Sequence, residues 1–251
     1  MKPDRTDGLL AHMSRVAGAA TGASPSLKPL DSASLLILDC SRNLPKVLMG
    51  RRHQNHSFMP GKFVFPGGSV EKSDSSMRVA GTLSPRTEAA LMTKVRRSSP
   101  GLCRALALSA IRETFEETGF MVGSKEYGTP DAPANTAWRT FKEHGVFPEL
   151  DRMSFIARAI TPPGLSKRFD TRFFVVDRRA VAEEPSGFVG PDSELTELAW
   201  VPLKHASKFE MSEITATIIE ELQQRLTNGL SEMLPVPFYH VRYGRAVRDY
   251  L

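Results

Sequence analysis

The feature that most constrains the fold is a helical pattern at residues 102–118, which ends in the stretch RETFEETGF. When successive residues are placed ~100° apart, one face is apolar and contains Ala107, Leu108, Ile111 and Phe115. The opposite face carries three acids, Glu113, Glu116 and Glu117. Gly119 follows, at the position where a left-handed backbone commonly ends a helix. The pattern therefore predicts a helix that buries one face in a core and presents carboxylates on the other.

The three carboxylates stand where a helix tolerates them least. Like charges at i,i+3 and i,i+4 repel, and the C-terminal end of a helix carries partial negative charge. No lysine follows four residues after any of these acids to relieve the repulsion. A solvated acidic surface would explain the acids without any function, and that interpretation stays open. A divalent cation such as Mg²⁺ would also relieve the repulsion, because hard cations take carboxylate oxygens as ligands.

A glycine pair precedes this helix, in the stretch FVFPGGSVEKSD. An apolar strand at residues 62–65 runs into Pro66, Gly67 and Gly68. Glycine permits positive φ and lets backbone N–H groups approach an anion closely. An ordinary tight turn would explain the glycines equally well. Together with the carboxylate helix, however, they predict half of a site for phosphate and metal.

The composition limits the function classes that remain. Of the 251 residues, 41% are hydrophobic and 24% are charged, as expected for a soluble globular protein. No apolar run reaches the ~18 residues that a membrane span requires, and the N-terminus lacks the apolar segment of a secretory signal. Cys40 and Cys103 lie outside any metal-ligand or disulfide pattern, which favours a reducing cytoplasm. The net charge of +5 suits an anionic small substrate as well as nucleic acid.

Strands and helices interleave along the chain. Strands are predicted at residues 34–40, 46–52, 62–65, 153–160, 171–179 and 194–202. An amphipathic helix is predicted at residues 212–226. Several strands follow hairpin-like turns, so we expect a mixed sheet with helices on both faces, in the α/β class. Residues 1–30 are rich in Gly, Ala, Ser and Pro and are expected to form a flexible arm before a single domain at 31–251.

The stretches GGSVEKSD and RETFEETGF together resemble the Nudix box, G-x5-E-x7-R-E-U-x-E-E-x-G-U, in which U is a bulky aliphatic residue. Gly68 matches the first glycine. The second half of the box is matched by Arg112, Glu113, Phe115, Glu116, Glu117, Gly119 and Phe120. The chain departs from the pattern in two ways: Asp74 replaces the first Glu, and residues 75–111 stand where seven residues are usual. These are 37 residues, an insertion of 30.

Further stretches narrow the resemblance. HQNHSFMPGKFVFPGG, the interrupted box and TPPGLSKRFDTRFFVV together resemble the Nudix branch that includes the peroxisomal coenzyme A diphosphatase of mammals. GKFVFPGG fits part of the motif ascribed to coenzyme A-cleaving members, although Ser57 stands where that motif has arginine. The resemblance covers roughly residues 34–203.

The resemblance implies a fold, a cofactor and a reaction. The fold is an α/β/α sandwich with a mixed sheet, here with a partly helical insertion at about 75–101 and a C-terminal helix. The cofactor is Mg²⁺ or Mn²⁺, and the reaction is hydrolysis of a nucleoside diphosphate derivative, with coenzyme A or acyl-coenzyme A favoured. NADH, ADP-ribose and dinucleoside polyphosphates stay open as substrates. A Nudix-like sensor that binds without cleaving is the alternative from another class.

The resemblance also assigns site residues. The catalytic set is Arg112, Glu113, Glu116 and Glu117, in which Glu113 and Glu117 are the first metal ligands, Glu116 is a third ligand or a supporting residue, and Arg112 braces the acids. Candidate substrate-binding residues are Arg52, Gly67, Gly68, Arg96 and Arg97. For the arginines the reason is that guanidinium groups suit phosphate, and ordinary surface charge stays open as the alternative. Glu194 and Glu197 are candidates for a base or an extra ligand, against the alternative of ordinary surface acids.

The insertion between the two halves of the box is expected to be partly helical. Ser84 and Pro85 resemble an N-cap and first helical residue. Both ends of the insertion are expected beside the metal site, which would bring Arg96 and Arg97 to the substrate. The favourable position of cations near a helix C-terminus would explain these arginines equally well. The expected partner is a small nucleotide, with neither nucleic acid nor membrane, and a homodimer stays open.

Overall fold

Nine strands form one mixed sheet in the part of the chain that the computed structural model describes, residues 5–19, 27–56, 59–184 and 187–251. The strands are β1 Leu30–Asp39, β2 Lys46–Arg52, β3 Phe63–Val64, β4 Gly67–Ser69, β6 Ser154–Ile160, β7 Phe169–Asp177, β9 Leu195–Pro202, β10 Pro237–Arg242 and β11 Arg245–Tyr250. The main order is β11-β10-β6-β7-β1-β2-β3, with β4 paired to β1 and β9 to β2. The pairs β1–β7 and β6–β10 are parallel and the others antiparallel, so the predicted mixed sheet is confirmed.

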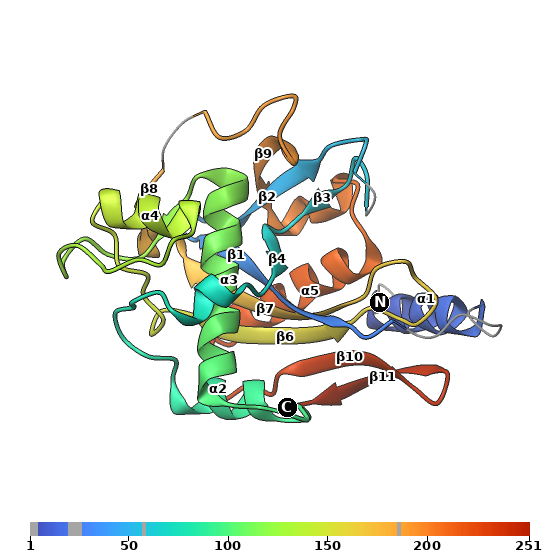
Figure 1. The fold of residues 1–251 in the computed structure, drawn as a ribbon. Coiled ribbons are helices and arrows are strands. Elements are labelled where there is room, and N and C mark those ends of the chain that lie inside the picture. The colour runs from blue at the N-terminus through green and yellow to red at the C-terminus, as the bar shows by residue number, and fades with distance from the viewer. Residues whose placement is uncertain (1–4, 20–26, 57–58, 185–186) are drawn as a thin grey trace.

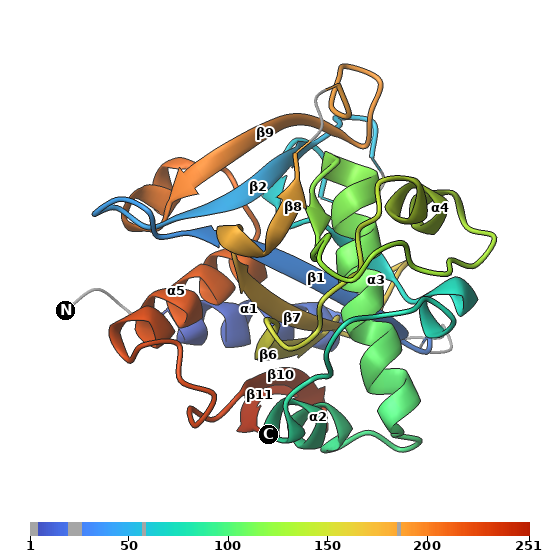
Figure 2. The same cartoon turned by 90° about the vertical axis from the view of Figure 1, so that its left-hand side faces the viewer.

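Helices cover both faces of this sheet (Figures 1 and 2). The helices are α1 Arg5–Ala19, α2 Pro85–Met92, α3 Pro100–Thr118, α4 Thr136–Glu143 and α5 Glu213–Thr227. Alternate residues of β1 point to opposite faces, as a strand requires: Leu35 packs in the core beneath α3, whereas Leu36 packs in the core beneath α5. A two-stranded sheet of β5 Met121–Val122 and β8 Val181–Glu183 lies beside α3. The expected α/β/α sandwich is confirmed.

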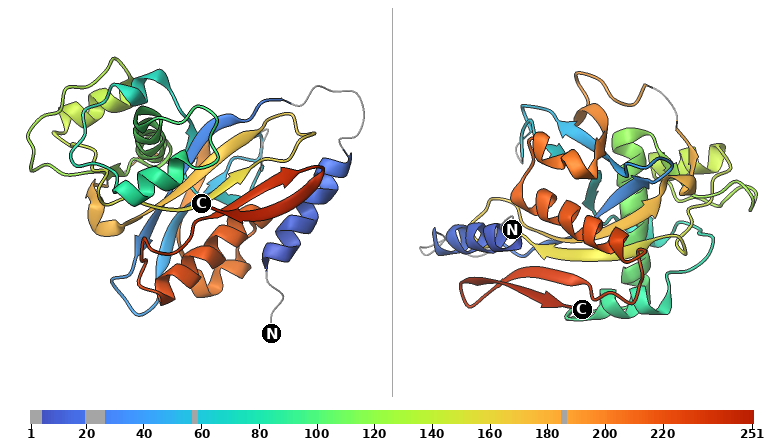
Figure 3. Two further views of the ribbon diagram at one scale, coloured as in Figure 1. Left: turned by 90° about the horizontal axis from the view of Figure 1, so that it is seen from below. Right: turned by 180° about the vertical axis from the view of Figure 1, so that it is seen from behind.

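Helix α1 corrects the prediction of a flexible arm at residues 1–30. The arm contains a helix at Arg5–Ala19 that buries Leu9 and Met13 against the core. An ion pair of 3.2 Å joins Arg5 to Glu220 of α5. Figure 3 shows α1 lying beside α5 and the β10–β11 hairpin. The prediction was wrong for residues 5–19, and residues 1–4 and 20–26 lie outside the described part of the chain.

The insertion contains the predicted helix, α2. Ser84 Oγ accepts a hydrogen bond from the N–H of Thr87 at 3.1 Å, and Pro85 begins the helix. The next helix, α3, begins at Pro100, with Ser99 as its N-cap. Its 19 residues make a helix about 28 Å long. The insertion therefore returns to the end of α3 that is far from the carboxylates, and the expectation that both its ends lie beside the acids was wrong.

The helix at 213–227 was predicted within one residue at each end, but it is followed by more structure. Strands β10 and β11 form a hairpin that extends the sheet beyond β6. Within the described ranges, no helix is long and apolar enough to cross a membrane.

Candidate active site

The acidic end of α3 lies against strand β4. Gly119 ends the helix with a φ of +83°, and its N–H donates to the carbonyl of Phe115 at 2.7 Å. A Cβ at residue 68 would lie 2.4 Å from the carboxyl carbon of Glu113, so any larger residue at Gly68 would displace that carboxylate. The N–H of Gly67 donates to Glu117 Oε2 at 3.3 Å. The glycine pair thus lets the β4 backbone touch both carboxylates.

This arrangement differs from the expected role of the glycines. Neither Gly67 nor Gly68 has a positive φ, because both belong to a strand that pairs with β1. The N–H of Gly67 is directed to a carboxylate, which is the role that the structure gives it. The sequence correctly indicated that the backbone of the glycine pair approaches an anion closely. It suggested that this anion is a phosphate, whereas in the structure it is the carboxylate of Glu117.

Arg112 braces the acids from the buried side of α3. Its side chain is only 1% exposed, and its Nη1 donates to Glu113 at 2.9 Å and to Glu116 at 2.7 Å. Its Nη2 also donates to the carbonyl of Ser69 at 2.8 Å. One guanidinium therefore ties the helix to β4, in agreement with the role that the resemblance implied.

Asp74 occupies the position where the Nudix box has Glu. It is fully buried, and both its oxygens accept from Arg112, at 2.8 and 3.1 Å. The N–H of Glu71 donates to the same carboxylate at 2.8 Å. Asp74 does not line the pocket that holds Glu113 and Glu117, so its role here is to anchor Arg112.

Burial and repulsion raise the pKa values of the two pocket carboxylates. Burial, together with the negative charges of Glu116 and Glu194, raises the pKa of Glu113 to about 7 against the pull of Arg112. Burial, with the charges of Glu194 and Glu113, raises the pKa of Glu117 well above its ordinary value, and Arg52 opposes this shift. The site thus concentrates negative charge that its own cations offset only in part.

Glu194 joins the site from the loop before β9. It lies 3.4 Å from Arg52 and 3.3 Å from His56, and all three residues line the same pocket. Phe188, in the same loop, packs edge-on against Phe115 of α3 with ring centroids 5.1 Å apart, which holds the loop beside the acidic helix end.

Glu197, the second candidate in this region, lies elsewhere. It forms a 3.1 Å ion pair with Arg51, and both side chains are about half exposed. It does not line the pocket, so the structure distinguishes the two acids that the sequence could not rank.

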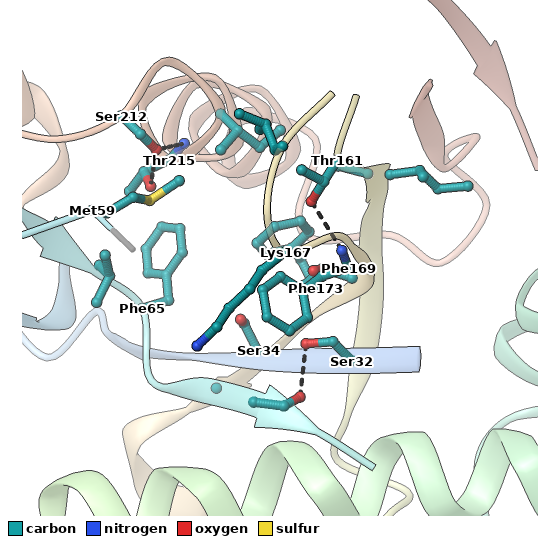
Figure 4. Close-up of a pocket in the computed structure, with 18 of the residues that line it drawn as sticks. Ser32, Ser34, Met59, Phe65, Thr161, Lys167, Phe169, Phe173, Ser212 and Thr215 are labelled. Atoms are coloured by element: carbon teal, nitrogen blue, oxygen red, sulfur yellow. Dashed lines mark hydrogen bonds between the residues drawn. The ribbon is translucent and has the colours of Figure 1, made fainter. Parts of the chain in front are cut away.

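The pocket has a volume of about 410 Å³, within the range of small-molecule sites. Its floor is formed by β1, β4 and the acidic end of α3. Figure 4 shows Phe65, Phe173 and Lys167 in the space between α3 and α5. Ser32 Oγ closes the floor by donating to the carbonyl of Gly68 at 2.7 Å.

Comparisons with known proteins bear on this site. No protein-family model matches the chain. A Caenorhabditis elegans protein provisionally named nudix hydrolase 7 is 28% identical over 184 residues, which cover 69% of this chain and 52% of that protein. The acyl-coenzyme A diphosphatase NUDT19 of Xenopus laevis is 34% identical over 95 residues, 31% of this chain and 25% of that protein. The chain thus spans about half of the first curated relative and a quarter of the second.

A solved structure matches over most of the fold. The Nudix hydrolase from Alicyclobacillus acidocaldarius superposes with a TM-score of 0.58 at 25% identity, over 77% of this chain and 90% of that one. The chain belongs to the Nudix hydrolase superfamily. Its Nudix box is split by the insertion in sequence, and Arg112 joins the two halves in space.

The Nudix carboxylates fit a divalent cation as a pair. Among the described residues, no three His, Cys, Asp or Glu side chains are grouped so as to enclose a metal ion. Glu117 is nevertheless buried and Glu113 partly buried, and these two mutually repelling carboxylates face a pocket. Mg²⁺ is commonly held by one or two carboxylates, with waters and substrate phosphates completing its shell. The donor set is therefore appropriate for Mg²⁺ or Mn²⁺.

The remaining predicted site residues lie outside the pocket. Glu116 is 38% exposed, bonds to Arg112 and does not line the pocket. Arg96 and Arg97 lie in the exposed turn before α3. The helical rise places this turn about 20 Å along α3 from Glu113. The structure therefore does not bring these arginines to the carboxylates, whereas it does bring Arg52 there.

Proposed function

We propose that this chain is a metal-dependent Nudix hydrolase that cleaves the diphosphate bond of a nucleoside diphosphate derivative, with coenzyme A or acyl-coenzyme A preferred. The observation that carries this proposal is the gathering of Glu113, Glu117 and Glu194 in one pocket. Their mutual repulsion and the burial of Glu117 are costly for the fold unless a cation is bound. Such a cost is expected at a functional site.

The chain's own residues supply specific parts of the hydrolysis. Glu113 and Glu117 would hold the cation, and Arg112 fixes the helix end from which they extend. Arg52 lines the same pocket beside Glu194, where its guanidinium can pair with a phosphate. Glu194 can accept the proton of the attacking water, and its contacts with Arg52 and His56 orient it. When bound, Mg²⁺ or Mn²⁺ would activate water and neutralise phosphoryl charge.

The preference for coenzyme A compounds rests on the resemblance and on one relative. The matched segment of the Xenopus laevis protein belongs to an enzyme named as an acyl-coenzyme A diphosphatase. The match covers 31% of this chain, so NADH, ADP-ribose and dinucleoside polyphosphates remain competing substrates. Ser57, which interrupts the coenzyme A motif, lies outside the described residues. The two cysteines are free thiols, which supports a cytoplasmic site of action.

The decisive experiment is a substrate panel. The purified chain is incubated with Mg²⁺ or Mn²⁺ and, separately, coenzyme A, acetyl-coenzyme A, long-chain acyl-coenzyme A, NADH, ADP-ribose and diadenosine tetraphosphate. Products are identified by mass. We expect 3′,5′-ADP and a 4′-phosphopantetheine product from the coenzyme A compounds, and no products in excess EDTA.

Other outcomes assign other functions. Preferred cleavage of NADH or ADP-ribose would keep the chemistry but reject the substrate. Saturable binding of one compound without any turnover would favour the alternative of a Nudix-like sensor. Full activity in EDTA would reject metal dependence.

A further inference from the structure

Helix α1 forms one wall of the active-site pocket. Leu9, Met13 and Val16 of this helix line the same pocket as Glu113 and Glu117. None of these helix residues belongs to the Nudix box or to the segment that resembles coenzyme A-cleaving enzymes. The pocket therefore has a component that the family motifs do not describe.

The pocket is elongated along strand β1. Gly67 pairs with Ser34, and Phe169 pairs with Leu30, four residues earlier on the same strand. Four residues of a strand span about 13 Å. Both Gly67 and Phe169 line the pocket, so the cavity extends by about that distance from the carboxylates toward the turn between β6 and β7.

The two ends of the cavity differ in chemistry. The carboxylates occupy the end at β4. Toward the β6–β7 turn, the lining residues include the apolar side chains of Ile160, Pro162, Leu165 and Phe169 beside Thr161 and Lys167, and Val16 of α1 lines the same pocket. Apolar groups of this kind suit a hydrocarbon chain, which gains free energy from contact with them and needs no hydrogen-bond partner.

Helix α1 is fastened to the rest of the fold before any ligand binds. Arg5 pairs with Glu220 of α5 at 3.2 Å. The N–H of Ala246 in β11 donates to Ser14 Oγ at 2.9 Å. A wall that is already in place costs little ordering free energy on binding.

We propose that the face of α1 containing Leu9, Met13 and Val16, together with the β6–β7 turn, forms a subsite for the thiol end of the substrate. This subsite receives the arm that leads to sulfur and the acyl group attached to it. The inference rests on the proposed function for the identity of the ligand. It adds that the N-terminal helix determines selectivity for acyl chains.

The test compares two substitutions on the same helix. Val16→Trp fills the subsite, whereas Ala11→Trp adds the same bulk at an exposed position that does not line the pocket. Binding of coenzyme A, acetyl-, octanoyl- and dodecanoyl-coenzyme A, and 3′,5′-ADP is measured by calorimetry in EDTA, so that the readout does not depend on turnover. The kcat/KM values for the same thioesters are measured with Mg²⁺.

We expect the wild-type Kd to fall at least tenfold from acetyl- to octanoyl-coenzyme A, since each fully buried methylene is worth up to about fourfold. In Val16→Trp the gain in affinity from acetyl- to octanoyl-coenzyme A should shrink to less than about threefold, whereas Ala11→Trp should keep the full gain. The Kd of 3′,5′-ADP should be the same for all three proteins. A wild-type affinity independent of chain length would overturn the proposal. Equal weakening of 3′,5′-ADP and the thioesters would also overturn it, since the nucleotide would then occupy this subsite.

A second pair of variants covers the case in which Val16→Trp does not fold. Leu165→Asp places a charge on the opposite wall at a side chain that is 40% exposed. Ser166→Asp adds the same charge at the next exposed residue, outside the pocket lining. Only Leu165→Asp should reduce the gain in affinity that a longer acyl chain gives.

The results distinguish this inference from the proposed function. Binding that depends on acyl-chain length, without hydrolysis, would reject the proposed function alone. Hydrolysis of coenzyme A compounds without any dependence on acyl-chain length would reject this inference alone.

Discussion

Arg112 and Asp74 form a buried, two-pronged ion pair, with Nε to Oδ1 at 2.8 Å and Nη2 to Oδ2 at 3.1 Å. The two residues are 38 positions apart, on either side of the insertion. The pair therefore joins the halves of the Nudix box whatever the length of chain between them. A shorter carboxylate than the usual Glu suffices here because Arg112 lies directly against it.

Breaking this pair should destabilise the fold. Asp74→Asn leaves a buried guanidinium short of one charge partner, and such losses typically cost about 3 kcal/mol or more. We expect Tm to fall by roughly 6–12 °C for a chain of this size, as measured by calorimetry or circular dichroism. Glu184→Gln, which removes an exposed partner of Arg178, serves as the control and should change Tm little. Equal effects of the two substitutions would contradict a structural role for Asp74.

The carboxylates of α3 should differ in importance. Glu117→Gln removes a pocket carboxylate and should lower kcat by ~100-fold or more, while raising Tm in EDTA because a buried like charge is lost. Glu116→Gln changes a neighbour that faces Arg112, outside the pocket, and its loss of kcat should be at least tenfold smaller. Steady-state kinetics and thermal unfolding check both statements. Equal loss in the two variants would return Glu116 to the metal-binding set.

Glu194 and Glu197 provide a matched pair near β9. Glu194→Gln should reduce kcat by ~100-fold or more, the usual contribution of a group that takes part in proton transfer. Glu197→Gln affects only the exposed pair with Arg51 and should stay within about twofold of the wild type. The comparison uses kcat at saturating metal. Should the Glu197 variant show the larger loss, the loop assignment would be wrong.

The stability of the metal-free protein should depend on pH through the pocket carboxylates. Burial and neighbouring charge raise the pKa of Glu113 from 4.5 to about 7. A raised carboxyl pKa contributes stability that is fully present below about 4.5 and is lost as pH rises through about 7. In EDTA, Tm should therefore decline between about pH 4.5 and 7, and Glu113→Gln should flatten the decline. A difference between wild type and variant that does not vary with pH would refute this.

Much of the fold could be predicted from local patterns. The apolar patterns around Leu35 and Phe174 are typical of strands, and the pattern around Glu113 is typical of a helix. Each pattern is long enough to fit only one kind of element. Helix α1 was missed because its Gly- and Ala-rich composition resembles a loose arm, and its few large apolar residues gain meaning only against α5. The C-terminal hairpin was missed because its partner strand, β6, lies some 80 residues earlier in the chain.

The site residues that lie close together in sequence were predicted, and those that depend on distant contacts were not. Arg112, Glu113 and Glu117 lie within two turns of one helix, so sequence spacing determines their proximity. Glu194 depends on a loop held by the contact of Phe188 with Phe115, which no local pattern reveals. Arg96 and Arg97 were assigned to the substrate because the insertion interrupts the Nudix box in sequence. In space, the length of α3 separates these two arginines from the carboxylates.

The position of α1 changes where the functional unit of this chain begins. A protein trimmed to begin at Leu30 would keep every residue of the Nudix box and the whole of β1. It would nevertheless open one side of the cavity, because Met13 and Val16 would be gone. Assays on such a truncated protein, or on one with a bulky tag fused close to Arg5, would report on an altered enzyme whose chemistry is retained and whose discrimination between substrates is not.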